Sequence, residues 1–177
     1  MQDLLCDMLF VIDMQNDFIT GSLGTKEAQE IVPNVVKKCR RYSENNKSIY
    51  FTRDTHYKNY LNSLEGEYLP VEHCIINEFG WEIYDELKKY TEPRNIIDKH
   101  TFGYRYDYPF ESYNYIPKQI EICGLCTDIC VISNALILRT KYPNTKIYLD
   151  SNCCAGTTPE KHNAALEVMK SCQIEVM

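Results

Sequence analysis

Short apolar runs alternate along the chain with segments whose apolar residues recur at helical spacing. Residues 9–12, Leu-Phe-Val-Ile, are continuously apolar, which is typical of a strand buried on both faces. The same reasoning predicts further strands at 48–52, 95–98, 118–123, 146–149 and 174–176. Helices are predicted between them, and strands that alternate with helices form parallel sheets. We therefore predict an α/β fold of three layers (α/β/α), with a six-stranded, mainly parallel, doubly wound sheet of Rossmann type.

The predicted helices differ in how well the pattern defines them. Residues 127–141 are the clearest case, because Cys130, Asn134 and Leu138 recur along one side. Pro33 is suited to the first position of a helix that ends near residue 44, and Thr158 or Pro159 opens the last helix. A further helix is predicted at 81–90. The polar stretch 53–80 is too long for a simple connection, so we expect it to be functional or mobile.

Several chemically active side chains follow predicted strands. Asp13, Asp54 and Lys99 each come directly after one, and the turn at 124–130 follows another. In open parallel sheets the ligand crevice lies beyond the carboxyl ends of the strands. We therefore expect these four segments to meet at one edge of the sheet.

Composition narrows the classes of function. The 177 residues fit a single domain, 1–177, and the net charge of -6 disfavours binding to nucleic acid. The apolar run at 4–14 contains two aspartates and is too short to span a bilayer, so we expect a cytoplasmic protein without a membrane partner. Nine cysteines with no sign of secretion indicate reduced thiols. A redox role for the Cys123-x-x-Cys126 spacing is disfavoured, because Cys123 falls at a predicted strand end rather than at a helix start.

The segment Gly124-Leu-Cys-Thr-Asp-Ile-Cys-Val131 leads from a strand through a turn into a helix. Spacing alone fits a buried core cysteine at position 130. The segment resembles the nucleophile motif of the isochorismatase-like cysteine hydrolases, in which a Gly-x-x-Thr-Asp-x-Cys-Val run carries the reactive cysteine. Residues 11–18, Val-Ile-Asp-Met-Gln-Asn-Asp-Phe, and 98–102, Asp-Lys-His-Thr-Phe, are similar to two further motifs of that family. The resemblance covers the chain from about Met8 to Met177.

The resemblance implies roles for these residues. Cys130 would be the nucleophile, Asp13 the acid/base and Lys99 a cation that keeps Asp13 ionised and favours the thiolate. The backbone N–H groups of Cys126 and Cys130 would form the oxyanion hole, beside a cis peptide common in the family before the Thr-Asp pair. Phe18 would line the substrate pocket. Cysteine at 126 departs from the small alanine that is frequent there.

One Asp and two His lie in the irregular stretch, at Asp54, His56 and His73. Surface histidines in a polar loop would give the same pattern. The segment resembles the metal-binding Asp-x-His and later His of nicotinamidases, which implies a divalent transition metal, with zinc first and iron or manganese as alternatives. Glu65 is the candidate fourth ligand, and Glu67 or a water is its alternative. The usual Trp between Asp and His is Thr55 here.

The resemblance thus implies a cysteine-dependent amidohydrolase that hydrolyses nicotinamide to nicotinate and ammonia through a thioester. A related amidohydrolase acting on another small amide is the alternative, and a non-catalytic regulator on the same fold is a third. Isochorismate cleavage is disfavoured, because the isochorismatases of this family typically do without the cysteine. We expect a small-molecule amide as substrate and a homo-oligomeric assembly.

Overall fold

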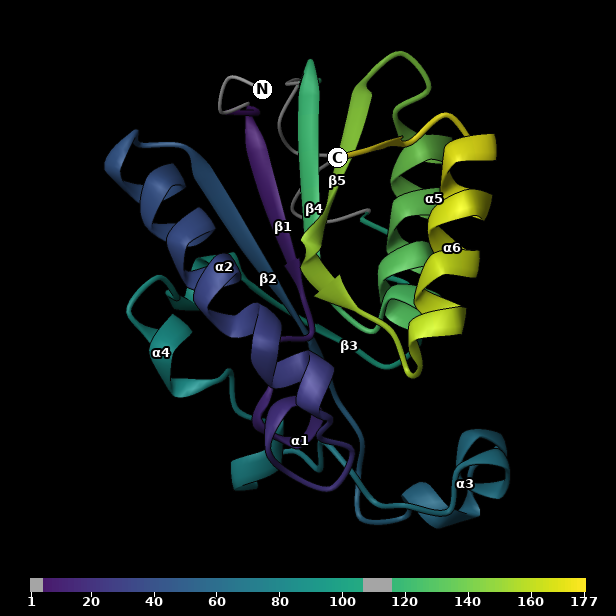
Figure 1. The fold of residues 1–177 in the computed structure, drawn as a ribbon. Coiled ribbons are helices and arrows are strands. Elements are labelled where there is room, and N and C mark those ends of the chain that lie inside the picture. The colour runs from purple at the N-terminus through teal and green to yellow at the C-terminus, as the bar shows by residue number, and fades with distance from the viewer. Residues whose placement is uncertain (1–4, 107–115) are drawn as a thin grey trace.

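Six parallel strands form one sheet in the computed structural model of the chain, which describes residues 5–106 and 116–177 (Figure 1). Every pair of neighbouring strands is parallel. The strands lie in the order β3 (Ile96–Lys99), β2 (Ser48–Asp54), β1 (Met8–Ile12), β4 (Gln119–Leu125), β5 (Lys146–Ala155) and β6 (Glu175–Val176). All six strands expected from the apolar runs are present, which confirms the predicted sheet.

The long helices cover both faces of this sheet (Figure 1). α2 (Lys26–Glu44) lies on one face, and α5 (Ile132–Lys141) and α6 (Pro159–Ser171) lie on the other. This follows from right-handed crossovers that run outward from β1 in one direction and from β4 in the other. The three-layer, doubly wound prediction is therefore confirmed. The shorter helices are α1 (Asn16–Ile19), α3 (Leu64–Tyr68) and α4 (Asp85–Lys88), with 3-10 turns at Tyr60–Asn62, Phe79–Trp81 and Pro93–Asn95.

The start of α2 differs from the prediction. The helix begins at Lys26 with Thr25 as its cap, whose hydroxyl accepts a hydrogen bond from the Ala28 N–H at 3.0 Å. Pro33 therefore lies inside the helix, at an exposed position, rather than at its first residue. The apolar stripe already starts at Ala28, and its burial together with the cap outweighs the cost of about 3 kcal/mol for an interior proline.

The predicted helix at 81–90 is also wrong in extent, because only Asp85–Lys88 is α-helical there. Tertiary contacts hold the preceding residues in an extended conformation. The N–H of Tyr84 donates to the carbonyl of Met14 at 2.9 Å, and Ile83 forms an antiparallel bridge with Gln15. This pairing withdraws residues 82–84 from the helix.

β4 and β5 are longer at their carboxyl ends than the apolar runs suggested. β5 continues through the adjacent Cys153 and Cys154, and the register against β4 shifts between Ile122 and Gly124. Gly124 has φ of 121°, and a Cβ there would lie 2.1 Å from the carbonyl oxygen of Ile12. Only glycine permits this close approach of β4 to β1. The two central strands thus end side by side.

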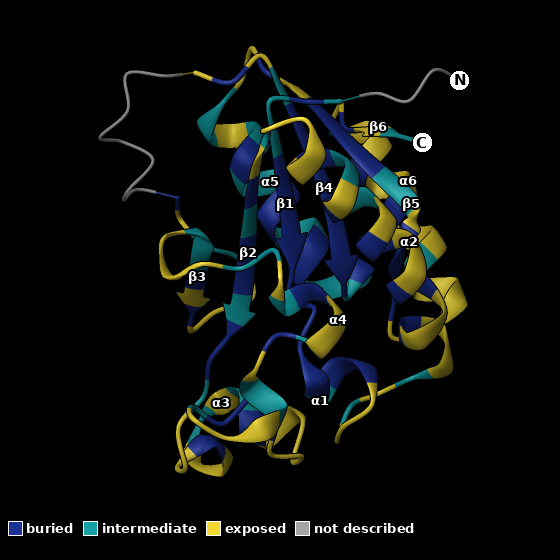
Figure 2. Cartoon of the chain, turned by 90° about the vertical axis from the view of Figure 1, so that its left-hand side faces the viewer, coloured by how far each residue is buried: buried dark blue, intermediate teal, exposed yellow. Residues whose placement is uncertain are grey.

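The carboxyl edge of the sheet carries the irregular stretch. The crossovers reverse direction between β1 and β4, and in doubly wound sheets ligands bind at this switch point. The lobe around α3 projects from the same edge, and much of its surface is exposed, whereas the central strands are buried (Figure 2). None of the helices in the described parts of the chain is both long and apolar enough to cross a lipid bilayer.

A buried ionic group lies between α2 and the sheet, away from that edge. Glu121 on β4 is 1% exposed and is paired with the ammonium of Lys38. Lys38 also contacts Asp150 at 2.8 Å, and the hydroxyl of Tyr42 donates to Glu121 at 2.6 Å. The carboxylate of Glu121 thus depends on α2 for both of its partners.

Lys38→Met is expected to lower the free energy of unfolding by about 3 kcal/mol, because it leaves the buried carboxylate of Glu121 without its cation. Urea unfolding followed by circular dichroism measures the change. Lys37→Met is the matched control, since Lys37 is the exposed neighbour on the same helix and its replacement should cost less than about 0.5 kcal/mol. Equal effects of the two substitutions would contradict the role of the buried pair.

Candidate active site

Asp13 occupies the turn that ends β1. It adopts a positive φ of 47° and is fully buried. Thr52 on the neighbouring β2 fixes its side chain, because the Thr52 hydroxyl donates to Asp13 Oδ1 at 2.7 Å. The Asp13 N–H in turn donates to the carbonyl of Thr52 at 3.2 Å. The carboxylate is therefore held in one orientation, with Oδ2 directed to its other partner.

That partner is Lys99, the last residue of β3. Its ammonium group is buried and lies 2.7 Å from Asp13 Oδ2 and 3.2 Å from Asp54 Oδ1. It also donates to the sulfur of Cys130 at 3.5 Å. One cation thus contacts two carboxylates and the thiol, and each comes from a different segment of the chain. The structure brings together Asp13, Lys99 and Cys130 as the sequence predicted.

Cys130 lies in a turn of π-helix, Thr127–Val131, which leads directly into α5. The peptide bond between Leu125 and Cys126, just before this turn, is cis, as the family resemblance implied. Asn134 holds the turn from one side, because its amide donates to the carbonyl of Cys130 at 2.7 Å. The structure thus fixes the position of the thiol, while the oxyanion hole at Cys126 and Cys130 stays a prediction.

The charges around the thiol do not favour a resting thiolate. Burial and the nearby Asp13 carboxylate raise the pKa of Cys130 well above its usual value, and the opposing effect of Lys99 is smaller. Burial also raises the pKa of Asp13, although the ammonium of Lys99 counteracts it. Lys99 lowers the pKa of both groups, as expected, but burial outweighs its effect on each of them. The site combines a neutral thiol with a carboxylate of increased proton affinity, which suits proton abstraction by Asp13.

A second group of side chains lies close to this trio. Asp54, His56, Glu65 and His73 each present one ligand atom, and these atoms all lie within 4.8 Å of one another. His56 Nε2 is 3.0 Å from Asp54 Oδ2 and 3.7 Å from Glu65 Oε1. Glu65, rather than Glu67, is thus the carboxylate that joins the predicted ligands.

The donor set fits a divalent metal ion. Two carboxylates and two imidazoles are ligands that zinc, iron and manganese accept. The Nδ1–H of His73 donates to the carbonyl of Val71 at 2.9 Å, so Nε2 is the nitrogen that faces the group. Hydrogen bonds with both imidazoles and the charge of Lys99 overcome the effect of burial and hold the pKa of Asp54 well below its usual range. The group can therefore hold a divalent metal.

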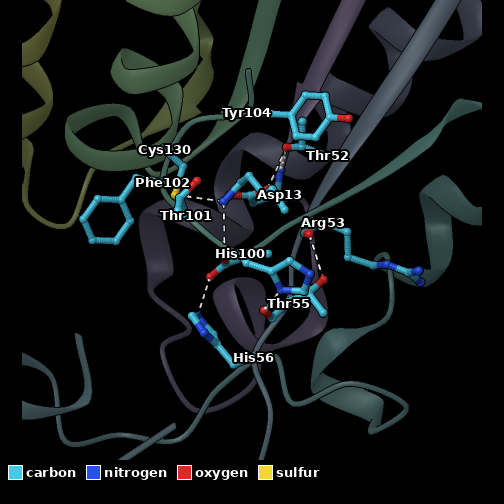
Figure 3. Close-up of polar contacts among 12 residues, drawn as sticks. Asp13, Thr52, Arg53, Thr55, His56, His100, Thr101, Phe102, Tyr104 and Cys130 are labelled. Atoms are coloured by element: carbon cyan, nitrogen blue, oxygen red, sulfur yellow. Dashed lines mark hydrogen bonds and ion pairs between the residues drawn. The ribbon is translucent and has the colours of Figure 1, made fainter. Parts of the chain in front are cut away.

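Asp54 joins the two groups. Its Oδ1 contacts Lys99, and its Oδ2 contacts His56. A continuous series of polar contacts therefore leads from the sulfur of Cys130 through Lys99 and Asp54 to His56. Figure 3 labels the two ends of this series, Cys130 and His56, and marks the contacts as dashed lines. We call Asp54, His56, Glu65 and His73 the metal-ligating group, because they can hold a metal. The thiol and this group belong to one site.

Phe18, the aromatic candidate for the pocket, and Trp81 have different surroundings. Phe18 is 9% exposed, and its ring centroid lies 5.6 Å from that of His73, beside the metal-ligating group. Trp81 instead stacks on the guanidinium of Arg53 and donates to the hydroxyl of Thr55 at 2.8 Å. Thr55, at the position where nicotinamidases usually have Trp, thus holds a tryptophan from elsewhere in the chain.

Several supporting residues escaped the sequence analysis. Thr52 orients Asp13, and Tyr60 packs its ring 4.7 Å from that of His56 and 4.9 Å from that of His73. Asn134 was predicted only as a member of a helical stripe. A polar residue in an apolar stripe can indicate a buried side chain that makes hydrogen bonds. Its side chain is fully buried and also accepts hydrogen bonds from the Tyr104 N–H and the Tyr106 hydroxyl.

A parallel α/β sheet with a buried Asp, Lys and Cys at its switch point is the arrangement of a cysteine hydrolase. The family to which the sequence belongs agrees with this class. The chain belongs to the isochorismatase family, because the isochorismatase domain matches residues 7–177.

Relatives of this family resemble the chain over nearly its whole length. The nicotinamidase of Saccharomyces cerevisiae is 25% identical over 215 residues, which cover 96% of this chain and 98% of the relative. A crystal structure of a Bacillus subtilis nicotinamidase is 26% identical, covers 97% of this chain and 99% of that one, and has a TM-score of 0.83. A pyrazinamidase of Pyrococcus horikoshii, solved in complex with zinc, is 27% identical over 96% of this chain and 97% of that one, with a TM-score of 0.77.

Proposed function

We propose that the protein is a nicotinamidase, a cysteine amidohydrolase that converts nicotinamide and water to nicotinate and ammonia. The observation that carries the proposal is the contact of Lys99 with both Asp13 and Asp54, because it joins a thiol and its base to a metal-ligating group. An amide on a nitrogen heterocycle has two features that match these groups, a carbonyl carbon for the thiol and a ring nitrogen for a metal. The similarity to nicotinamidases and a pyrazinamidase supports the same substrate class.

The first half of the reaction forms a thioester. Asp13 takes the proton of the Cys130 thiol, and the sulfur attacks the carboxamide carbon to give a tetrahedral adduct. The backbone N–H groups of Cys126 and Cys130 are assigned to the oxyanion. Asp13 then returns the proton to the amide nitrogen, the C–N bond breaks, and ammonia leaves. Lys99 remains charged throughout, because its pKa is raised well above the usual value by the two carboxylates despite its burial.

The second half releases the acid. Asp13 takes a proton from water, the hydroxide oxygen attacks the thioester, and the C–S bond breaks. The proton returns to the sulfur of Cys130, which restores the neutral thiol that the buried site favours. One protein residue thus carries the proton in both halves, which accords with the increased proton affinity of buried Asp13.

We assign the metal-ligating group to zinc, held by Asp54, His56, His73 and Glu65. When bound, such an ion supplies a Lewis-acidic position for the pyridine nitrogen. Phe18, beside His73, is assigned to the wall of the pocket against which the ring packs. A single domain, 1–177, carries all of these residues.

Ammonia release from nicotinamide, pyrazinamide and two aliphatic amides, with and without a chelator, tests this function. We expect turnover of both heterocyclic amides, and we expect it to fall when the metal is removed. Turnover of the aliphatic amides should be slower by about tenfold or more. Faster turnover of an aliphatic amide that is insensitive to the chelator would instead identify an amidohydrolase of another small amide. No ammonia release from any of them would favour the non-catalytic regulator.

A further inference from the structure

Three polar side chains that follow Asp13 bind the irregular lobe to the sheet. We call Gln15, Asn16 and Asp17 the N-terminal clamp. Gln15 is fully buried, and its amide donates to the carbonyls of Asp54 and Trp81 at 2.8 and 2.9 Å. Asn16 donates to the carbonyl of Phe79 at 2.7 Å. The clamp therefore contacts both ends of the stretch that carries the metal-ligating residues.

Asp17 contacts the middle of that stretch. Its Oδ2 accepts a hydrogen bond from the N–H of Cys74 at 2.7 Å. This N–H belongs to the peptide that follows His73, and Cys74 has a positive φ of 48°. The carbonyl of Cys74 accepts a hydrogen bond from the N–H of His56 at 3.0 Å. Cys74, which Asp17 holds, thus follows His73 directly and accepts a hydrogen bond from His56.

Two glycines make room for the Asp17 carboxylate. A Cβ at Gly80 would lie 1.9 Å from Asp17 Oδ2, and a Cβ at Gly21 would lie 2.3 Å from Oδ1. Any larger residue at either position would have to displace the carboxylate or move the backbone. The local packing thus leaves space for this side chain in its bonded position.

We propose that Asp17 is a positioning residue for the metal-ligating group: through Cys74 it holds His56 and His73 in register, without contributing a ligand atom of its own. The inference rests on the proposed function, because it assumes that the group binds a metal. Removal of a residue that hydrogen-bonds directly to a metal ligand typically changes metal affinity by about 10–100-fold, and we expect an effect in this range for Asp17, which acts through the Cys74 backbone. The segment after the catalytic Asp13 would therefore set the geometry of the second half of the site.

The test is titration of the metal-stripped full chain with zinc, together with the visible absorption spectrum of the cobalt-loaded protein. Asp17→Ala is expected to weaken zinc binding by about 10–100-fold and to alter the cobalt bands. Asp17→Asn keeps an oxygen that can accept from Cys74, so it should restore most of the affinity and the native spectrum. Gly80→Ala, which crowds the carboxylate, should weaken binding by an independent route if Asp17→Ala fails to fold.

Asp7→Ala is the matched control. Asp7 also accepts hydrogen bonds from backbone N–H groups, those of Lys118 and Gln119, but away from the clamp, next to the start of β4. Its loss should leave zinc affinity and the cobalt spectrum unchanged. Native affinity and spectrum in both Asp17→Ala and Gly80→Ala would overturn the inference, as would an Asp17→Asn variant as weak as Asp17→Ala. If the unmodified chain itself bound no zinc or cobalt, the metal assignment in the proposed function would fail as well.

Discussion

Cys130→Ala is expected to reduce ammonia release from nicotinamide by about 10⁴-fold or more while leaving the fold intact, because it removes the atom proposed to form the thioester. The methyl group of alanine fits where the thiol lies, and the hydrogen bond that the sulfur accepts from Lys99 is long, at 3.5 Å. Steady-state ammonia release and circular dichroism together measure the two parts of this prediction.

Cys123→Ala and Cys153→Ala are the controls for that substitution. Both cysteines are buried in strands of the sheet, β4 and β5, and burial raises the pKa of each thiol. Both thiols lie near Lys38 rather than near Asp13 and Lys99, so their loss should cost some stability but retain turnover. Activity of the Cys130→Ala variant close to that of the controls would remove Cys130 from the mechanism.

The partners of Cys130 should show graded effects. Asp13→Asn keeps a side-chain oxygen for Thr52 but cannot accept the thiol proton, so turnover should fall by about 10²–10⁴-fold. Lys99→Ala removes the cation between two buried carboxylates and should lower both turnover and stability. Unchanged turnover in Asp13→Asn would show that another group takes the proton.

His56→Ala and His73→Ala are expected to weaken nicotinamide binding by about 100-fold, because each removes a proposed ligand of the metal that is proposed to anchor the ring nitrogen. The measurement is calorimetric titration of nicotinamide into metal-loaded protein that also carries Cys130→Ala, so that no turnover interferes. Metal content is determined on the same samples. Asp54 is a poorer position for this test, since it contacts Lys99 as well as His56.

Benzamide is the matched ligand for the same prediction, because it keeps the carboxamide and lacks the ring nitrogen. It should bind about 100-fold more weakly than nicotinamide to the metal-loaded protein and should lose little further affinity in His56→Ala or His73→Ala. Equal binding of benzamide and nicotinamide, or active protein without bound metal, would move the assignment to an amidohydrolase of another small amide.

Local sequence determined the positions of the strands and placed the reactive side chains at the strand ends. Continuous apolar runs located all six strands, because a strand buried on both faces has no polar face to interrupt it. The position of Asp13 and Lys99 at strand ends was readable for the same reason, and parallel strands bring such ends to one edge. The three motifs of the family resemblance then distinguished Cys130 from the eight other cysteines.

The exceptions arose where distant residues decide the local conformation. Pro33 marked a helix start by propensity, but the cap at Thr25 and the buried stripe extend α2 past it. Residues 82–84 have a helical pattern, yet the chain around Gln15 pairs with them. Neither contact is visible in a window of neighbouring residues.

The sequence by itself thus predicted which groups carry the chemistry, because the family motifs single out Cys130 and because Asp13 and Lys99 come at strand ends. Only the tertiary structure decided how these groups are coupled. The contact of Lys99 with both Asp13 and Asp54, the raised pKa of Cys130 and the support of Cys74 by Asp17 all join segments far apart in the chain. Distances of this kind depend on packing, and proton affinities depend on burial and on every nearby charge, so neither can be read from residue order.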